Sequence, residues 1–288
     1  MIIDGRLIAQ EILDDLKRRV EELRTNNVRP HLHIITLTTD SASESYVGQK
    51  KKKGEEIGAK ITVENLDPRT STESLLEKIK LLNEDQSVHG IIVQRPFSPQ
   101  IDEEKIANSI NPEKDVDGFH PDSKFDPPIS ESVLRILEEV YAQTYEVEAS
   151  LTSQVDFDEW LKSQKITVIG RGVTAGGPII KTFEKTGSDL VVVTSKTEDR
   201  EKILKSSDII ICAVGKTDTV KGSNLKKGVI LIGVGMFKGE DGKFHSDYEE
   251  NDIKDIASFY TPTPRGVGPV NVAMLLSNLI KATGNKTS

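Results

Sequence analysis

The chain has 288 residues, of which 36% are hydrophobic and 29% are charged. This length and composition are typical of a globular protein with about two domains. Lysine and arginine number 38, and aspartate and glutamate number 46, so the formal net charge is −8, which disfavours nucleic acid or an anionic membrane as a partner. No apolar run approaches the roughly 18 residues that a membrane-spanning helix needs, so we expect no membrane segment.

The start of the chain and its few cysteine and histidine residues narrow the class of protein further. The segment MIIDGRLIAQEI lacks the basic region and apolar stretch of a signal peptide, which predicts a cytoplasmic protein. A single cysteine, Cys212, excludes an intramolecular disulfide and a thiolate metal cluster. The histidines have no ligand spacing, and His31 and His33 lie two apart, as neighbours on one face of a strand do. We therefore expect no metal.

Apolar residues in the first half of the chain alternate between helical and strand spacing. An amphipathic helix is predicted over 7–24 by apolar side chains three or four positions apart, namely Ile8, Ile12, Leu16, Val20 and Leu23. Three predicted strands follow, at 31–37, 60–66 and 89–94. Two helices separate them, one over 41–58 and one that begins at a capping-box pattern formed by Thr70 and Glu73. Strands separated by helices pair in parallel, so this half predicts an α/β layer structure.

The second half repeats this alternation after a junction. Residues 119–130 are rich in proline, aspartate and serine, and we interpret them as an inter-domain junction. A helix is predicted from Ser130 to about Gln143, whereas the segment up to Trp160 has no clear pattern. Four near-continuous apolar strands are then predicted, as for a sheet covered on both faces, at 165–170, 189–196, 208–215 and 228–235. The apolar stretch 267–284 predicts a buried terminal helix.

A glycine-rich turn lies between the first of these strands and a predicted helix over 178–187. Gly170, Gly172 and Gly176 give the spacing G-x-G-x-x-x-G, one residue longer than the usual dinucleotide fingerprint. Glycines let the backbone approach a phosphate, and the start of a helix adds N–H donors and the positive end of its dipole. Pro178 suits the first helical turn, where its missing N–H removes no bond. The context favours a nucleotide site over a tight turn that binds nothing.

Residues at the end of the next strand indicate which nucleotide binds. Thr194, Ser195 and Lys196 stand where enzymes that use NAD present an acidic residue to the ribose 2′-hydroxyl, and Arg171 lies on the preceding loop. Hydroxyl and cationic side chains suit a 2′-phosphate, so NADP is favoured over NAD, although Lys196 alone also fits a solvated strand end. Cys212 lies within an apolar strand, which favours a buried structural thiol over a nucleophile.

Tyr46 and Lys50 are four residues apart, so they share one face of the predicted helix. The run 50–53 consists of four lysines, and such a run is usually a solvated face. Four consecutive helical positions point in all directions, however, so one lysine must face the protein, and Lys50 below Tyr46 is the natural choice. Burial and neighbouring ammonium groups lower the pKa of a lysine, which would suit Lys50 to proton transfer.

Other polar residues follow strands or lie in constrained loops. Gln94 ends the third predicted strand, and open α/β sheets bind ligands at the carboxyl ends of their strands. Asp115 and Asp117 lie in the loop KDVDGFHP, where simple turn chemistry is the alternative to a binding role. The segment 261–270, TPTPRGVGPV, combines prolines and glycines ahead of an apolar helix. Such a rigid loop could line a flat aromatic ligand.

Together these segments resemble the bifunctional methylenetetrahydrofolate dehydrogenase/methenyltetrahydrofolate cyclohydrolase family. The resemblance covers most of the chain and rests on motifs in the family's order: IIDG, SxxYVxxK around Tyr46 and Lys50, HGIIVQxP, NPEKDVDGFHP, GR followed by GxP, TSKT and TPxPxGVGP. It implies oxidation of 5,10-methylenetetrahydrofolate to the methenyl form with NADP, and hydrolysis of the methenyl form to 10-formyltetrahydrofolate. It also implies a homodimer that binds tetrahydrofolate derivatives.

The family's fold implies an N-terminal α/β domain, a Rossmann-type NAD(P)-binding domain and a C-terminal helix that returns to the first domain. The folate would lie in the cleft between the two domains. On this sequence we expect the folate-binding catalytic domain over 1–122, completed by a helix over 266–288. The NAD(P)-binding domain is expected over 123–265.

The resemblance also implies roles for individual residues. Lys50 is the expected catalytic lysine and is tuned by Gln94, while Tyr46 stacks on the folate's aromatic part and Asp117 bonds to the pterin. These four residues form the expected catalytic set, and they also bind the substrate. The substrate-binding set adds four residues of the TPTPRGVGP loop, namely Pro264, Gly266, Val267 and Gly268. The cofactor-binding set comprises Gly170, Arg171, Gly172, Thr194, Ser195 and Lys196.

The sequence departs from the family's pattern near these sites. Pro127-Pro128-Ile129-Ser130 stands in place of the usual P-C-T-P after a shortened connection, and the segment 141–160 is longer than usual. Four single residues stand where the family has serine, glycine, aspartate and leucine, at Gly172, Arg265, Gly233 and Arg95 respectively. These changes bear on substrate affinity, on cofactor preference and on the relative rates of the two activities.

Two rival hypotheses remain open at this point. Another two-domain NADP dehydrogenase, of the shikimate dehydrogenase kind, also pairs a lysine and an aspartate, but its small anionic substrate gives Tyr46 and the TPTPRGVGP loop no purpose. A degenerate folate- or NADP-binding protein is suggested by the altered P-C-T-P region and Arg265, whereas the retained Lys50 argues against it.

Overall fold

The structure is a computed structural model that describes residues 1–37, 41–145, 156–239 and 242–284. The chain divides into two compact units. The five-stranded unit consists of Met1–Ile8 and Ile129–Asn271, and the three-stranded unit consists of Ala9–Pro128 and Val272–Ser288. Among the described residues, no helix has the length and apolar character needed to span a membrane.

The three-stranded unit is built on a parallel sheet with the order β2-β1-β3. Its short strands lie within the segments that the residue patterns predicted, and they are β1 (His31–Thr36), β2 (Lys60–Asn65) and β3 (Gly90–Val93). Among the described residues, five helices contribute to the unit: α1 (Gly5–Thr25), α2 (Ser41–Glu56), α3 (Thr72–Glu84), α4 (Glu103–Ser109) and α10 (Val267–Gly284). The boundary between the two units falls inside α1 and inside α10, so each helix contributes to both.

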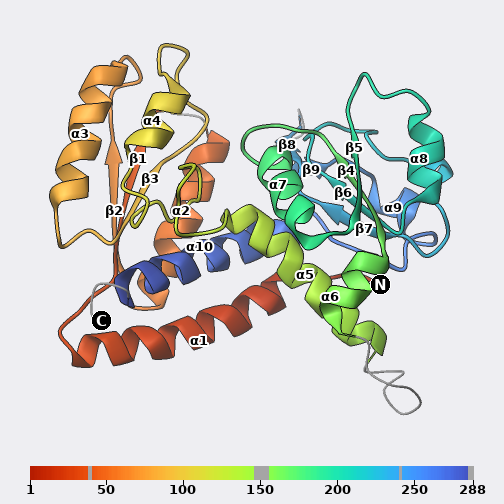
Figure 1. Ribbon diagram of the computed structural model, residues 1–288, viewed down its shortest axis with the longest axis horizontal. Helices are drawn as coiled ribbons and strands as arrows, with labels where there is room; N and C mark the ends of the chain where they lie inside the picture. Colours follow the sequence, from red (N-terminus) through yellow and green to blue (C-terminus); the bar gives the residue numbers. More distant parts are fainter. Residues whose placement is uncertain (38–40, 146–155, 240–241, 285–288) are drawn as a thin grey trace. The chain divides into compact units, whose positions relative to one another are not determined.

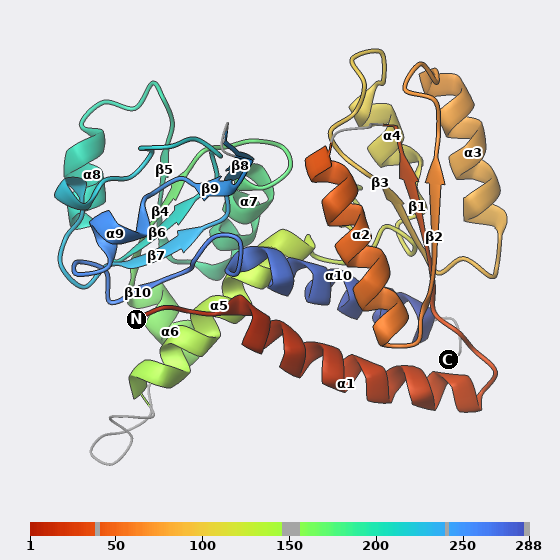
Figure 2. The ribbon, with the colours of Figure 1, turned by 180° about the vertical axis from the view of Figure 1, so that it is seen from behind.

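Every residue of the central strand β1 is buried, and its apolar residues Leu32, Ile34 and Ile35 pack on both sides of the sheet. Leu32 and Ile34 pack into a cluster with side chains of α1, α2 and α10. Ile35 lies in a second cluster with side chains of α3 and α4 on the opposite face. Figures 1 and 2 show these two helical layers with the sheet between them. The predicted return of the C-terminal helix to the first half of the chain is confirmed by the apolar residues that α10 adds to the first cluster.

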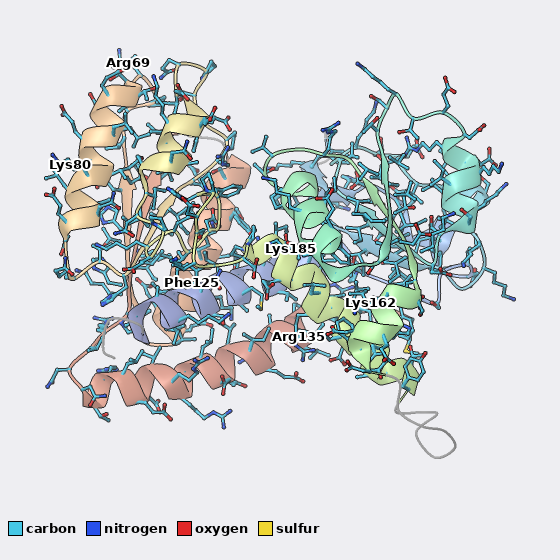
Figure 3. The ribbon with its side chains drawn as sticks, viewed as in Figure 1. Arg69, Lys80, Phe125, Arg135, Lys162 and Lys185 are labelled. Carbon is cyan, nitrogen blue, oxygen red and sulfur yellow. The ribbon has the colours of Figure 1, made fainter. Side chains whose placement is uncertain are left out.

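The start of α3 differs from the predicted capping box by one residue. The N-cap is Ser71, whose hydroxyl accepts a bond from the Ser74 N–H at 3.2 Å. Thr70 instead donates its hydroxyl to the Asp67 carbonyl in the preceding turn, so the predicted role of Thr70 as the cap is wrong. The apolar face of α3 packs on the sheet, and Figure 3 shows Lys80 on the opposite, outer face of the helix.

The five-stranded unit holds a parallel sheet with the order β10-β7-β6-β4-β5. Its strands are β4 (Lys165–Ile169), β5 (Asp189–Val193), β6 (Ile209–Cys212), β7 (Ile230–Gly233) and β10 (Phe259–Tyr260). The main-chain groups of Ile3 and Met1 bond to Tyr260, which explains why the first residues belong to this unit. The chain reverses its direction of winding between β4 and β6, and such a switch point is the ligand crevice of doubly wound sheets. The predicted α/β, Rossmann-type class is confirmed.

The remaining elements of this unit cover the sheet or extend it. They are α5 (Pro128–Tyr145), α6 (Phe157–Ser163), α7 (Gly176–Thr186), α8 (Arg200–Ser206), α9 (Glu250–Ile253), the 3-10 turn Gly222–Asn224 and a hairpin of β8 (Met236–Lys238) and β9 (Phe244–Ser246). Part of the unassigned segment 141–160 is helical, and its residues 146–155 lie outside the described part of the chain. Around that part, Tyr141 lies 5.5 Å from Trp160 between ring centroids, so aromatic packing joins the end of α5 to α6.

Candidate functional site

The first group of predicted site residues meets at the side chain of Lys50. Helix α2 places Lys50 so that it is only 3% exposed, and its ammonium donates to the Gln94 Oε1 atom at 3.0 Å. The amide nitrogen of Gln94 donates to the Arg95 carbonyl at 2.8 Å, which turns the amide oxygen toward Lys50. Gln94 directly follows β3, so the strand fixes one partner and the helix fixes the other.

Tyr46 lies one helical turn before Lys50, and the predicted shared face is confirmed. The Lys50 ammonium is 5.1 Å from the centroid of the Tyr46 ring, within the range of a cation–π contact. Lys51 and Lys52 are exposed, and Lys53 pairs with Glu56. Only the first lysine of the run therefore faces the interior, as the helical geometry predicted.

The surroundings of Lys50 change its acidity. Burial lowers the pKa of the ammonium, and the negative charge of Asp117 opposes this effect by raising the pKa. The main cause is thus the loss of hydration and not the neighbouring ammonium groups named in the sequence prediction. A buried amine with a lowered pKa can lose its proton more easily than a lysine in water.

The KDVDG loop that carries Asp117 is anchored by its own first residue. The buried ammonium of Lys114 donates to the carbonyl oxygens of Leu82, Asn83 and Asp85, at 2.8, 2.7 and 2.8 Å. These carbonyls belong to the end of α3, where a cation also meets the negative end of the helix dipole. The loop is therefore tied to α3, although nothing in the spacing of the sequence indicated this contact.

The two aspartates of the loop lie in different surroundings. Asp115 is buried and accepts the His120 N–H at 2.8 Å, and burial raises the pKa of its carboxyl to about 6. Asp117 is partly exposed, and it is close enough to Lys50 to act on its pKa. Gly118 has a φ of +72°, and a Cβ there would lie 2.8 Å from the Pro127 nitrogen, so glycine is required at this turn.

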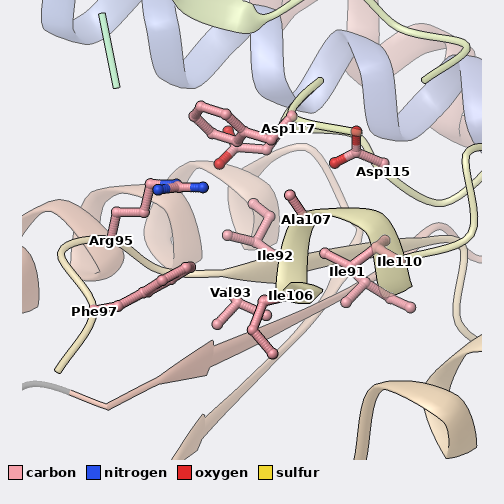
Figure 4. Close-up of a pocket in the computed structure, with 11 residues that line it drawn as sticks. Ile91, Ile92, Val93, Arg95, Phe97, Ile106, Ala107, Ile110, Asp115 and Asp117 are labelled. Atoms are coloured by element: carbon pink, nitrogen blue, oxygen red, sulfur yellow. The ribbon is translucent and has the colours of Figure 1, made fainter. Parts of the chain in front are cut away.

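An apolar pocket lies beside this loop and ends at the two carboxylates (Figure 4). Strand β3, helix α4 and the residue that follows α4 form most of its wall, with Ile91, Ile92, Val93, Ile106, Ala107 and Ile110. The guanidinium of Arg95 lies over the rings of Phe97 and Phe119, 4.6 and 4.5 Å from their centroids. Arg95 also pairs with Glu103. Arg95, which stands where the family has leucine, is therefore part of the pocket wall and does not extend freely into water.

The second group of predicted site residues lies in the five-stranded unit, at the carboxyl ends of its strands. Gly170 directly follows β4 with a φ of +94°, and a Cβ there would lie 2.6 Å from the Ala213 carbonyl oxygen. A Cβ at Gly176 would lie 2.3 Å from the Gly170 carbonyl oxygen. Helix α7 starts at Gly176 without a side-chain cap, and Pro178 lies in its first turn as predicted. The close backbone packing and the uncapped helix start fit the diphosphate of a dinucleotide.

The turn after β5 lies next to this glycine turn because the two strands pair in register. Ile169 and Val193 are partners at the ends of β4 and β5, so Gly170 and Thr194 begin neighbouring loops. The hydroxyl of Thr197 accepts the Thr194 N–H at 2.9 Å, which closes the second loop. Arg171, Ser195 and Lys196 are all exposed on these two loops. Cys212 is fully buried on β6, and burial raises the pKa of its thiol, which is the structural environment predicted for it.

The structure therefore brings the predicted residues together in two separate groups. Tyr46, Lys50, Gln94 and Asp117 lie in the three-stranded unit, whereas all six cofactor-binding residues lie in the five-stranded unit. The four predicted residues of the TPTPRGVGP segment belong to the five-stranded unit at the start of α10, and they are Pro264, Gly266, Val267 and Gly268. In that segment, a Cβ at Gly266 would lie 2.7 Å from the Pro262 carbonyl oxygen.

These two groups define a class of protein, a two-domain α/β enzyme with a buried lysine site in one unit and a dinucleotide-type turn in the other. Comparison with known families gives the particular one. The chain matches the family model of the tetrahydrofolate dehydrogenase/cyclohydrolase catalytic domain over residues 3–117. It matches the NAD(P)-binding domain of the same family over residues 149–287. The chain belongs to the tetrahydrofolate dehydrogenase/cyclohydrolase family, and it is a bifunctional enzyme of that kind.

Individual relatives support this assignment over the whole chain. The Bifunctional protein FolD of Staphylococcus saprophyticus is 37% identical over 287 residues, which cover 98% of this chain and 96% of the relative. The crystal structure of the bifunctional enzyme FolD from Campylobacter jejuni has a TM-score of 0.88 at 31% identity, with 99% of each chain covered. The Trypanosoma brucei enzyme, whose structure was solved with NADP cofactor and inhibitor, has a TM-score of 0.85 at 28% identity and covers 100% of this chain and 98% of its own.

Proposed function

We propose that this enzyme oxidises 5,10-methylenetetrahydrofolate with NADP and hydrolyses the methenyl product to 10-formyltetrahydrofolate, with Lys50 as the proton-transfer group. The observation that carries this proposal is the buried Lys50 ammonium, 3.0 Å from Gln94 and beside the ring of Tyr46. Gln94 would tune the lysine, and Asp117 would bind the pterin. The proposal rests on residues of the three-stranded unit and on the two reactions that the family catalyses.

The dehydrogenase step requires orientation more than proton transfer. NADP, when bound, supplies C4 of its nicotinamide as the hydride acceptor. In this chain, the Tyr46 ring would stack on the aromatic part of the folate and hold the methylene carbon in place. The Asp117 carboxylate would accept bonds from the amino group and ring N–H of the pterin. No side chain needs to take a proton in this step.

The hydrolysis step requires a group that accepts and returns protons. Water adds to the methenyl carbon, and the neutral amine of Lys50 takes one proton from it. The bond between this carbon and N5 then breaks, and N5 gains a proton from the Lys50 ammonium. The hydroxyl on the carbon loses its proton to solvent as the formyl C=O forms. The lowered pKa of Lys50 favours the neutral form that begins this sequence.

The nucleotide site is proposed to prefer NADP. Gly170, Gly172 and Thr194 would lie along the backbone of the cofactor, because they begin the two adjacent loops at the strand ends. Arg171, Ser195 and Lys196 are exposed there and would contact the 2′-phosphate. Gly172 offers no hydroxyl where the family has serine, so we expect the preference to be moderate.

Two further assignments follow from the family. Residues of the TPTPRGVGP segment would contribute to folate binding, namely Pro264, Gly266, Val267 and Gly268. The enzyme would also act as a homodimer in the cytoplasm. Light scattering coupled to gel filtration would test the dimer.

The experiment that tests the function follows methenyl formation and methenyl hydrolysis separately by absorbance. Lys50→Met should abolish hydrolysis and leave a measurable part of the dehydrogenase activity, because only hydrolysis needs the amine. Lys52→Ala is the matched control, since Lys52 is exposed on the same helix. Near wild-type hydrolysis by Lys50→Met would show that another group transfers the proton.

The family assignment also decides between the two rival hypotheses of the sequence analysis. Both family models and the bifunctional relatives favour neither an enzyme of the shikimate dehydrogenase kind nor a degenerate binding protein.

A further inference from the structure

Asp247 is a buried carboxylate that none of the sequence motifs singled out. It follows the short strand β9 and is 0% exposed. Its Oδ2 atom accepts the Val214 N–H at 3.3 Å, and its Oδ1 atom accepts the Lys216 N–H at 3.0 Å. Its main-chain carbonyl accepts the Val220 N–H at 3.0 Å. A single residue thus fixes the backbone of the loop that follows β6.

One glycine leaves room for this carboxylate, and a second allows the turn of the loop beside it. A Cβ at Gly235 would lie 2.1 Å from the Asp247 Oδ2 atom and 2.3 Å from the Gly215 nitrogen. Gly215 itself has a φ of +73°, a conformation that other residues rarely adopt. The loops after β6 and after β7 are therefore shaped around the Asp247 side chain, and a larger residue at Gly235 would displace it.

The loop that Asp247 holds lies against the glycine turn of the nucleotide site. Strands β4 and β6 pair so that Ile169 and Cys212 are partners, which places the following residues side by side. The missing Cβ of Gly170 would lie 2.6 Å from the Ala213 carbonyl oxygen and 3.1 Å from the Val214 Cγ2 atom. This position, between β4 and β6, is the switch point of the sheet.

The loop also presents an apolar side chain at this point. Val214 is 47% exposed, two positions after the buried end of β6 at Cys212. An exposed aliphatic side chain beside a phosphate-type turn suits a flat ring of the nucleotide. Its position depends on the main-chain N–H of Val214 itself, which Asp247 accepts.

We infer that Asp247 is a positioning residue for the nucleotide, which acts by holding the backbone of residues 214–216 so that Val214 contacts the bound NADP. The inference rests on the proposed use of NADP. It assigns to Asp247 no contact with substrate or cofactor. Its effect passes through the loop, so it should alter nucleotide affinity and leave the chemistry of the other unit unchanged.

Asp247→Asn tests this role, because it keeps the size of the side chain and replaces one acceptor oxygen with an NH₂ group facing a backbone N–H. The dissociation constant of NADPH, measured by fluorescence titration, should rise about ten-fold or more, as expected for the loss of a charge-assisted bond. Hydrolysis of methenyltetrahydrofolate needs no nucleotide and should keep its kcat/KM. Asp252→Asn is the matched control, because the Asp252 carboxylate holds the Gly222 N–H at 2.6 Å in the segment that leads into β7.

Three outcomes decide the question. A selective loss of NADPH affinity in Asp247→Asn, absent from Asp252→Asn, supports the positioning role. Unchanged NADPH affinity, or an equal loss of affinity, hydrolysis and thermal stability, overturns it. Where Asp247→Asn does not fold, Val214→Ala decides, since its side chain is exposed, and unchanged NADPH affinity in that variant overturns the inference. Wild-type NADPH binding distinguishes failure of this inference from failure of the proposed function. If the enzyme does not use NADP, the wild type itself will not bind NADPH. If only the inference fails, the wild type binds NADPH and Asp247→Asn binds it equally well.

Discussion

The Oε1 atom of Gln94 accepts the Lys50 ammonium at 3.0 Å, and the amide is held in this orientation by the Arg95 carbonyl. Gln94 is therefore a neutral partner for a buried cation. An amide stabilises the ammonium less than a carboxylate does, so it leaves the lowered pKa of Lys50 in place. A neutral amide at this position is what a proton-transfer lysine requires.

Replacing Gln94 by glutamate tests this relationship. The new carboxylate would stabilise the charged form of Lys50 and raise its pKa, so the neutral amine would appear only at higher pH. The rising limb of the pH profile of hydrolysis should move up by about one pH unit or more. Gln86→Glu adds the same charge at an exposed position of the same unit and should leave the profile unchanged. An unshifted profile in Gln94→Glu would contradict the role of Lys50 as the base.

The raised pKa of Asp115 predicts a pH dependence of stability. Its folded-state pKa of about 6 exceeds the ordinary value of 3.8, chiefly because the carboxyl is buried. The folded state therefore holds the proton more tightly than the unfolded state, and stability from this group is lost as the pH rises between these two values. The amide side chain of the Asp115→Asn variant does not ionise, so this variant does not lose stability over that pH range.

The measurement is urea unfolding of both proteins at two pH values. Relative to wild type, the free energy of unfolding of Asp115→Asn should increase by about 2 kcal/mol between about pH 4.5 and about pH 7.5. Asp122→Asn, an exposed change in the same loop, is the control and should show no such increase. A constant difference between Asp115→Asn and wild type would mean that the Asp115 carboxyl ionises normally in the folded protein.

The cofactor preference gives a third prediction. Arg171 is exposed on the glycine turn, beside the loop of Ser195 and Lys196. Arg171→Ala should weaken NADP binding roughly ten-fold and NAD binding much less, because only NADP carries the 2′-phosphate. Dissociation constants of the two reduced cofactors would be compared, with Lys202→Ala, an exposed change on α8, as the control. Equal losses for both cofactors would mean that Arg171 shapes the loop.

Much of the fold was predictable because its elements carry local patterns. The apolar run 267–284 coincides with α10, and β3 and β6 are short apolar runs because every residue in them is buried. The hairpin of β8 and β9 escaped prediction, since strands of three residues are too short to show a period. The cap of α3 was misplaced by one residue because Thr70 and Ser71 carry equivalent hydroxyls.

The site was predictable only in part, and the reason lies in the partners of its charged residues. Lys50 could be found because a run of lysines on a helix forces one inward. Lys114 and Asp247 could not, because their partners are main-chain groups about 30 residues away in the chain, which no spacing reveals. Arg95 stood out as a departure from the family, but its contacts with Phe97 and Phe119 exist only in the folded loops.

Asp117 gives the last prediction, and Asp115 two residues earlier is its comparison. Asp117 is partly exposed at the end of the pocket, whereas the buried Asp115 accepts a main-chain N–H within its own loop. Asp117→Ala should raise the KM for folate at least about ten-fold, because the donors of the pterin would lose their charged acceptor. The NADPH dissociation constant and the melting temperature should stay close to wild type.

A second readout makes this prediction specific to Asp117. The charge of Asp117 raises the pKa of Lys50, so Asp117→Ala should lower that pKa further. At saturating folate, the rising limb of the pH profile of hydrolysis should therefore move to lower pH, opposite to the shift in Gln94→Glu. If Asp117→Ala instead melts at a markedly lower temperature with folate affinity and pH profile intact, Asp117 serves only the turn. Asp117→Asn keeps the size of the side chain and should show the same pH shift, because the shift depends on the charge alone.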